Sequence, residues 1–278
     1  MADSRPQRCF LERLNAIAVV SGGTFPPACT REVRIMADEE ERLEGRVILV
    51  TGGGSGLGAA ICADLAREGA KMAVVDINPA SSGRVMEDIR RQGGTASAFA
   101  MDVGDEHAIM DGLERILADF GRLDAIVNNA GVDVTTGIRE METSDWHRVI
   151  ATNLTGPFLL SKHGLEYLSP GGHIVNIAST AARRAWPNAS AYHASKWGLM
   201  GLTHALHAEL RSTGIKVSAV IAGGMRTPFL LERFPDIDVD LLQDPQNVAR
   251  AVKFVLTQPP QTVIPEVMVL PMKETSWP

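Results

Sequence analysis

The sequence has few cysteines and no long apolar run, and each absence excludes a class of protein. Cys9, Cys29 and Cys62 do not have the spacing of metal ligands and cannot form a full disulfide set, which favours a reducing compartment. The longest apolar run near the N-terminus, residues 16–20, is too short for a signal peptide or a membrane span. We therefore expect a cytoplasmic protein without a membrane segment.

Positive charge is also scarce, since 27 lysines and arginines stand against 33 aspartates and glutamates and the formal net charge is -6. Without a basic face, neither nucleic acid nor an anionic membrane is an expected partner, and a small soluble ligand is favoured. His204 and His207 could be imagined as metal ligands, but no third ligand has a suitable spacing. The sequence therefore predicts no metal site.

What the sequence does contain, from Arg46 onward, is a regular alternation of short β-branched runs with longer helical stretches, as in successive βαβ units. Strands are predicted at residues 47–50, 72–76, 97–101, 125–128, 173–177, 216–221 and 267–270. Helices are predicted at roughly 56–68, 79–92, 105–120, 145–168, 191–211 and 245–257. Apolar strands joined by right-handed crossovers predict an α/β fold of the Rossmann type, doubly wound, with a mostly parallel seven-stranded sheet covered by helices on both faces.

We expect residues 44–278 to form a single domain of this kind. Residues 1–43 show no clear hydrophobic period and are predicted to be an N-terminal extension outside it. Met36 precedes an acidic run, and one hypothesis is that the native protein starts there.

A glycine-rich stretch, "VILVTGGGSGLGAA", follows the first predicted strand and opens the first helix. Glycines at this point allow a tight turn and a close approach to a pyrophosphate, and the helix N-terminus supplies N–H groups for the anion. A plain tight turn is the alternative interpretation. The position between a strand and a helix favours a dinucleotide site.

Asp76 ends the second predicted strand, near the offset of about 20 residues at which a carboxylate binds the ribose hydroxyls of the adenosine. A carboxylate there repels a 2'-phosphate, and neither Ser55 nor Ile77 offers the positive charge that such a phosphate needs. NAD is therefore favoured over NADP. The alternative is an ordinary aspartate that caps a turn.

Tyr192 and Lys196 lie four positions apart in "AYHASKWG" and share one face of a predicted helix. A nearby ammonium stabilises a phenolate and lowers the pKa of the phenol, so the pair could exchange a proton with an alcohol or a carbonyl oxygen. This spacing also arises by chance. Ser179, just past the strand "HIVNIA", is expected at the same edge of the sheet, where its hydroxyl could hold a substrate oxygen.

Two amide segments complete the pattern. Asn153 lies inside a predicted helix, where asparagine is disfavoured and can produce a kink or bind water, although a solvent-facing side chain is the alternative. The segment "VNNAGV", residues 127–132, ends the fourth strand, where amides can bond backbone and hold neighbouring strands together.

These residues, in this order, resemble the short-chain dehydrogenase/reductase family over residues 46 to about 228. The matching positions are Thr51, Gly52, Gly56, Gly58, Asp76, Asp102, Val103, Asn128, Asn129, Ala130, Gly131, Asn153, Ser179, Tyr192, Lys196 and the turn 223–227. One departure is Ala222-Gly223, where the family usually has proline-glycine.

The resemblance implies a catalytic set in which Tyr192 is the acid–base residue, Lys196 lowers its pKa and holds the nicotinamide ribose, Ser179 orients the carbonyl, and Asn153 positions a water that links Lys196 to solvent. Thr227 is expected to reach the carboxamide of the nicotinamide. The implied cofactor-binding residues are Gly52, Ser55, Gly56, Leu57, Gly58, Asp76, Ile77, Asp102, Val103, Asn129, Ala130, Gly131, Tyr192, Lys196, Gly223 and Thr227.

The expected function is hydride transfer between NAD(P), with NAD preferred, and a secondary alcohol or ketone. A catalytically silent dinucleotide-sensing protein of the same fold is the alternative. Substrate contacts are expected from the loops 133–143, 183–190 and 225–244, where Phe229 and its apolar neighbours form either a lid or a small surface helix. A homodimer or homotetramer is expected; the leucines of the helix 191–211 are predicted to serve either such an interface or the core.

Overall fold

The computed structural model describes residues 43–273. The chain separates into two contact units, Met1–Glu40 and Glu41–Pro278, and the described residues belong to the second. The extension predicted at 1–43, with Met36, lies outside the described residues except for Leu43. The Leu43 side chain is fully buried in the core.

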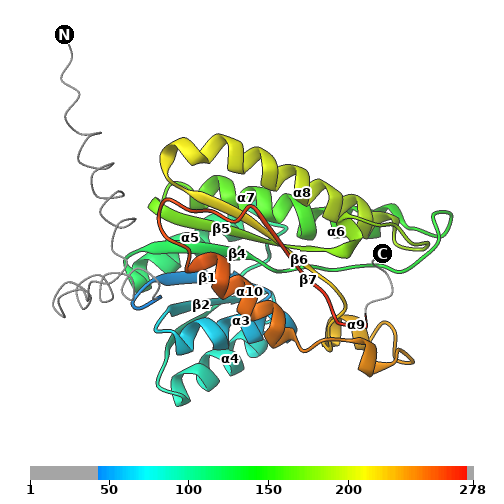
Figure 1. The fold of residues 1–278 in the computed structure, drawn as a ribbon, viewed down its shortest axis with the longest axis horizontal. Helices are drawn as coiled ribbons and strands as arrows, with labels where there is room; N and C mark the ends of the chain where they lie inside the picture. Colours follow the sequence, from blue (N-terminus) through cyan, green and yellow to red (C-terminus); the bar gives the residue numbers. More distant parts are fainter. Residues whose placement is uncertain (1–42, 274–278) are drawn as a thin grey trace, which may run out of the picture. The chain divides into compact units, whose positions relative to one another are not determined.

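The described residues contain seven strands in one sheet, which confirms the predicted fold class (Figure 1). The strands are β1 (Val47–Thr51), β2 (Lys71–Asp76), β3 (Thr95–Ala100), β4 (Leu123–Asn128), β5 (Leu168–Ser179), β6 (Lys216–Ala222) and β7 (Glu266–Val269). Their order is β3-β2-β1-β4-β5-β6-β7, and every neighbouring pair is parallel. The order reverses between β1 and β4, and ligands bind at such a switch point in open α/β sheets.

Helices cover both faces of the sheet (Figure 1). On one face are α3 (Gly56–Arg67), α4 (Pro79–Arg91) and α10 (Pro245–Leu256); on the other are α5 (Glu106–Phe120), α7 (Gly156–Gly164) and α8 (Ser190–Leu210). The strands are buried on both sides, so that in β1 Ile48 faces the core under α3 while Leu49 faces the core under α5. This two-sided burial explains why the strands are continuous apolar runs.

The predicted helix 145–168 is wrong as a single element. The structure has α6 (Thr143–Ile150), a π-helical segment (Ala151–Thr155) and then α7. Pro157 lacks an N–H group and cannot bond the carbonyl of Asn153 four residues earlier, so the regular α-helical pattern is interrupted here. The irregularity expected at Asn153 is therefore present.

The end of that predicted helix is also wrong, because Leu168 already belongs to β5. Leu168 pairs with Leu123 of β4, and a register shift follows before His173 pairs with Ala125. The sequence signal for β5 starts only at His173, after the exposed residues 169–171 and the buried Gly172.

The remaining short elements are α9 (Pro228–Leu231) and three 3-10 turns. Like α9, the turns Thr180–Ala182 and Val239–Leu241 come after a strand ends, whereas the turn Arg211–Thr213 precedes β6 at its amino end. Leu199 of α8 is buried, and Leu206 and Leu210 pack against the core, so these leucines serve the core. Among the described residues, no helix is both long and apolar enough to cross a membrane.

Candidate active site

The predicted site residues follow different strands but meet at one edge of the sheet. The glycine loop follows β1, Asp76 ends β2, and Asn129 follows β4. Ser179 ends β5 and Gly223 follows β6. Because all the strands are parallel, their carboxyl ends lie side by side, and the loops beyond them form one site.

The glycine loop is packed so closely that side chains are excluded from it. Gly52 has a φ of +62°, a conformation that favours glycine. A Cβ on Gly58 would lie 2.0 Å from the carbonyl oxygen of Gly52. The first turn of α3 therefore lies directly against the loop that precedes it.

The N-terminus of α3 also differs from those of α4, α5 and α10. Asn78, Asp105 and Asp244 cap these three helices with side-chain oxygens. Ser55, the corresponding residue of α3, makes no such bond within the described residues. The first N–H groups of α3 thus lack this side-chain cap and fit the phosphates of a dinucleotide.

Asp76 is held at the glycine loop by both carboxylate oxygens. Oδ2 accepts a hydrogen bond from the Gly54 N–H and Oδ1 accepts one from the Asn78 N–H, each at 2.9 Å. The aspartate thus caps a turn and also faces the loop where the adenosine ribose is expected. Arg84 donates to the Ser81 hydroxyl at 3.0 Å, and Ser81 adjoins Gly54, which brings near the loop a cation that sequence reasoning missed.

The amides after β4 bond to the backbone of β1, as predicted. The Asn129 side chain donates to the Thr51 carbonyl oxygen at 2.8 Å. The N–H groups of Asn129 and Ala130 both donate to the Thr51 hydroxyl at 3.0 Å. These bonds fix the loop after β4 against the glycine loop.

Asn153 is fully buried, so the alternative of a solvent-facing side chain is wrong. Its Oδ1 accepts from the Val132 N–H, and its Nδ2 donates to the Val132 carbonyl oxygen, each at 2.8 Å. Nδ2 also lies 3.1 Å from the Ser195 hydroxyl. A Cβ on Gly131 would lie 3.6 Å from Asn153 Oδ1 and 3.9 Å from Lys196 Nζ. One amide thus joins the loop after β4 to α8 beside Lys196.

The Ser179 side chain lies close enough to the Tyr192 hydroxyl to lower the pKa of Tyr192. Ser179 Oγ also accepts from the Ala181 N–H at 3.1 Å, in the turn where β5 ends. Tyr192 lies in the first turn of α8, which begins beside that turn. The two hydroxyls thus face each other from neighbouring elements.

The electrostatics of Tyr192 differ from the expectation. Burial raises the pKa of Tyr192 to about 12, and the nearby Ser179 side chain opposes that rise only in part. Lys196 Nζ donates to the Ile177 carbonyl oxygen at 2.8 Å and lies 5.7 Å from the centre of the Tyr192 ring. Burial lowers the pKa of Lys196 to about 8. The desolvation of both groups, which the sequence does not reveal, acts against their charged forms.

The turn after β6 approaches the glycine loop. A Cβ on Gly56 would lie 3.3 Å from the Thr227 Cβ, and Thr227 is buried. The Gly223 N–H donates to the Val269 carbonyl oxygen of β7 at 2.9 Å, so the alanine before it does not leave the turn unsupported. At the end of β3, Val103 is buried and Asp102 is exposed.

A cover over Tyr192 comes from α9 and the residues after it, the segment in which Phe229 was expected to form either a lid or a small surface helix. The rings of Phe229 and Tyr192 lie 6.0 Å apart, and the guanidinium of Arg233 lies 4.5 Å from the Phe229 ring. Arg233 reaches the loop after β4, where it forms an ion pair with Asp133 at 3.5 Å and donates to its carbonyl oxygen at 3.2 Å. Sequence reasoning did not single out either partner.

Two substrate loops are also joined directly. The Thr136 N–H donates to the Asn188 carbonyl oxygen at 2.9 Å. Asn188 has a φ of 64°, which asparagine tolerates better than most residues. On the same loop as Asn188, the Trp186 and His193 rings lie 4.3 Å apart, and the Trp186 N–H donates to His193 Nε2.

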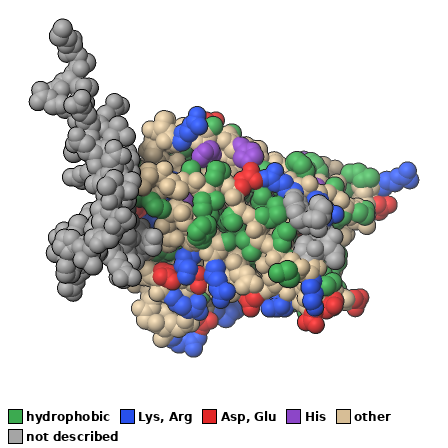
Figure 2. Space-filling model, in the orientation of Figure 1, with side chains coloured by type: hydrophobic (Ala, Val, Ile, Leu, Met, Phe, Trp, Pro, Cys, Tyr) green, Lys and Arg blue, Asp and Glu red, His purple; other side chains and the backbone are tan. Residues whose placement is uncertain are grey.

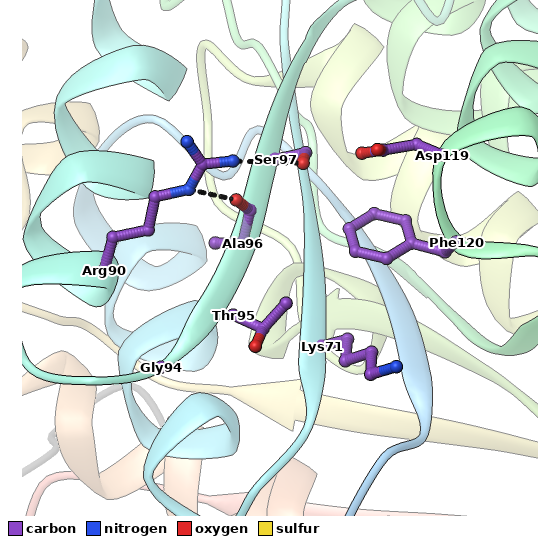
Figure 3. A pocket seen from close by; sticks show the side chains of 8 residues that line it. All are labelled: Lys71, Arg90, Gly94, Thr95, Ala96, Ser97, Asp119 and Phe120. Carbon is purple, nitrogen blue, oxygen red and sulfur yellow. Dashed lines mark hydrogen bonds between the residues drawn. The ribbon is translucent and has the colours of Figure 1, made fainter.

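A cavity of about 400 Å³ lies away from this site, at the amino ends of β2 and β3 (Figure 3). Its Arg90 already donates to the Ala96 carbonyl oxygen at 2.7 Å and lies 3.4 Å from the Ser97 hydroxyl. These bonds hold α4 against β3. The cavity contains none of the predicted site residues.

A doubly wound parallel sheet whose carboxyl edge carries a glycine loop, a serine, a tyrosine and a lysine defines a dinucleotide-dependent oxidoreductase. The sequence model described as short chain dehydrogenase matches residues 46–238, and this chain belongs to that family.

Individual relatives differ in what they act on. D-threitol dehydrogenase of Mycolicibacterium smegmatis is 37% identical over 195 residues, which are 69% of this chain and 74% of that protein. A 3beta-hydroxysteroid dehydrogenase of Mediterraneibacter gnavus is 34% identical over 198 residues, 70% of this chain and 72% of that protein. A crystal structure of a metagenomic short-chain oxidoreductase in complex with NADP has a TM-score of 0.71 and 34% identity, and the match covers 83% of this chain and 99% of that one.

Proposed function

We propose that this protein interconverts a secondary alcohol and a ketone with a nicotinamide dinucleotide, and that Tyr192 is its acid–base residue. The observation that carries the proposal is the arrangement at the carboxyl edge of the sheet: Ser179 ends β5, and Tyr192 and Lys196 lie together on α8, with Lys196 Nζ 5.7 Å from the centre of the Tyr192 ring. The Ser179 and Tyr192 hydroxyls are thereby placed to hold one substrate oxygen between them. When bound, the dinucleotide supplies the hydride chemistry.

In the proposed reaction, Ser179 donates a hydrogen bond to the carbonyl oxygen and Tyr192 gives that oxygen its phenolic proton during reduction. During oxidation the proton moves from the alcohol to Tyr192. Lys196 holds a positive charge near the phenolate that must form, 5.7 Å from the ring centre. Asn153, which adjoins Lys196 through Gly131, is proposed to support a water path to solvent.

We propose NAD as the preferred cofactor, because the Asp76 carboxylate is held at the glycine loop by two backbone N–H groups. In this position it accepts hydrogen bonds from ribose hydroxyls and repels a 2'-phosphate. Arg84, which donates a hydrogen bond to Ser81 beside the loop, is a cation that favours the 2'-phosphate of NADP. NADP is bound in the crystal structure of the metagenomic relative, whereas the preference for NAD is proposed for this protein alone.

We also propose a homodimer or homotetramer that acts in the cytoplasm. Phe158 on α7 and Met110 on α5 belong to neighbouring helices, and their side chains are 46% and 42% exposed. Large exposed apolar side chains on adjacent helices favour a protein interface. The cytoplasm is proposed because the three cysteines give no disulfide set.

The deciding variant is Tyr192→Phe, which keeps the ring and removes the hydroxyl. We expect turnover of secondary alcohols and ketones to fall about 100- to 10,000-fold, because the acid–base group is lost. Dinucleotide affinity is expected to change little. The measurement is nicotinamide absorbance in a panel of alcohols and ketones with NAD and with NADP, together with dinucleotide titration.

The matched control is Tyr167→Phe, the same change at the other tyrosine of the chain. Tyr167 packs against the core at the end of α7, and this variant is expected to keep its activity. Equal activity of Tyr192→Phe and the native protein would refute the mechanism.

The alternative, a dinucleotide-sensing protein without turnover, is favoured by one observation. Burial raises the pKa of Tyr192 to about 12, which keeps the phenol protonated and leaves little phenolate to accept a proton. Tight dinucleotide binding with no turnover of any compound in the panel would support the sensor over the enzyme.

A further inference from the structure

Asp133 is an acidic side chain joined to the cover over Tyr192. It lies on the loop after β4, and its side chain is only 8% exposed. Arg233, its ion-pair partner, lies 4.5 Å from the Phe229 ring, and that ring lies 6.0 Å from the Tyr192 ring. Asp133 is therefore a buried carboxylate connected to Tyr192 through this cover, and its charge acts on Tyr192.

The two carboxylate oxygens of Asp133 have different surroundings. Oδ2 faces Arg233, whose Nη1 lies 3.5 Å away. Oδ1 is buried and has no hydrogen-bond partner among the described residues. A buried carboxylate oxygen without a partner is costly, by about 1–3 kcal/mol or more for a charged group, so it needs a donor that a ligand can supply.

The charge around Asp133 indicates which donor fits. Arg233 already compensates the carboxylate, and a second cation beside it would be repelled by the guanidinium. A neutral hydroxyl donates a hydrogen bond without adding charge. The Phe229 ring, which lies between Arg233 and the Tyr192 ring, offers an apolar surface that suits a carbon skeleton.

We propose, resting on the proposed function, that Asp133 determines substrate specificity: Oδ1 accepts a hydrogen bond from a second hydroxyl of the substrate, so that the site takes diols and polyols in preference to simple secondary alcohols. The reacting hydroxyl binds Ser179 and Tyr192 while the second hydroxyl binds Asp133. A substrate without the second hydroxyl leaves Oδ1 unpartnered, and such a loss discriminates strongly against it.

The test compares 2,3-butanediol with 2-butanol, which differ by one hydroxyl. Binding is measured by isothermal titration calorimetry on Tyr192→Phe protein with NAD present, so that no turnover is needed. We expect the diol to bind at least about tenfold more tightly, and Asp133→Ala in this background to remove the difference. In protein with native Tyr192, Asp133→Ala is expected to lower the ratio of kcat/KM for 2,3-butanediol to kcat/KM for 2-butanol by the same factor.

Two further variants separate recognition from support of the cover. Asp133→Asn keeps an acceptor oxygen and is expected to retain part of the preference for the diol, whereas a residue that only anchors Arg233 would lose activity on both alcohols equally. Glu140 is an exposed residue of the same loop, and Glu140→Ala is expected to change neither the binding ratio nor the kcat/KM ratio of the two alcohols.

Equal binding of the two alcohols to protein with native Asp133 would overturn the proposal about Asp133. Absence of turnover with every alcohol and ketone would overturn the proposed function separately, because the binding comparison does not depend on turnover.

Discussion

At the scale of the residue, opposing effects act on the pKa of Tyr192. Burial raises the pKa, and the nearby Ser179 side chain lowers it by a smaller amount. At neutral pH the phenol is therefore protonated and ready to donate. Reduction of a carbonyl uses this form directly, whereas oxidation of an alcohol requires the form that burial disfavours.

This difference predicts how the two directions depend on pH. With the pKa of Tyr192 raised to about 12, the phenolate fraction grows through the whole neutral and alkaline range. Alcohol oxidation should rise with pH by up to about tenfold per pH unit, and carbonyl reduction should not rise. Initial rates in both directions from about pH 6 to pH 10 test this, with circular dichroism at each pH to confirm that the fold persists. A rate of oxidation that is independent of pH would contradict it.

The sequence could predict the identity of these residues but not their electrostatics. The spacing of Tyr192 and Lys196 places both on one helix face, as observed. It does not reveal that Lys196 bonds the Ile177 carbonyl oxygen or that both groups are desolvated. Asp133 and Arg233 are 100 positions apart, and no local pattern links them.

At the scale of the element, the glycine loop depends on contact between two backbone segments. The Gly58 Cα of α3 faces the carbonyl oxygen of Gly52 with no room for a methyl group. The loop and the first turn of α3 must therefore move together. Dinucleotide binding and the packing of α3 are expected to respond to the same substitution.

We predict opposite effects for two glycine-to-alanine substitutions in neighbouring helices. Gly58→Ala should destabilise the fold by about 1–3 kcal/mol, because the new Cβ overlaps the Gly52 carbonyl, and it should weaken dinucleotide binding. Gly83→Ala in α4 meets no atom within 4 Å and should stabilise the fold by about 0.5–1 kcal/mol through helix propensity.

Urea denaturation gives the two stabilities, and fluorescence titration gives the dinucleotide affinities. If Gly58→Ala binds the dinucleotide as the native protein does, the close packing of the loop is not needed for binding.

Element boundaries were predictable where local chemistry marks them. Asp244 followed by proline starts α10 as predicted, with its side chain bonded to the Gln246 N–H. The interruption near Asn153 was predictable in position but not in form, because the amide is held by Val132 and Ser195 from distant parts of the chain.

At the scale of the whole molecule, the fold was the most predictable property. Two-sided burial makes the strands apolar throughout, and parallel pairing requires a crossover between successive strands, so both features leave a strong pattern in the sequence. Surface patterns are weaker. In Figure 2, apolar side chains occur across the middle of the face shown, while charged side chains gather lower, over α3 and α4.

The proposed oligomer gives a prediction at this scale. Phe158→Glu on α7 should shift the protein toward monomers, because a charge would have to be buried in the proposed interface. Light scattering coupled to size-exclusion chromatography measures the shift. Phe254→Glu is the matched control, since Phe254 is 52% exposed on α10, on the other face of the sheet. An equal mass for both variants and the native protein would argue against assembly through α7.

The loops at the carboxyl edge of the sheet are bonded to one another, and these bonds determine how the substrate preference could be changed. The loop after β4 is bonded to the loop before α8 through Thr136 and Asn188, and to the segment after α9 through Asp133 and Arg233. Exchanging one of these loops for that of a relative would leave the others without their anchors. Transplanting substrate preference between relatives should therefore succeed when all three segments are moved as a set.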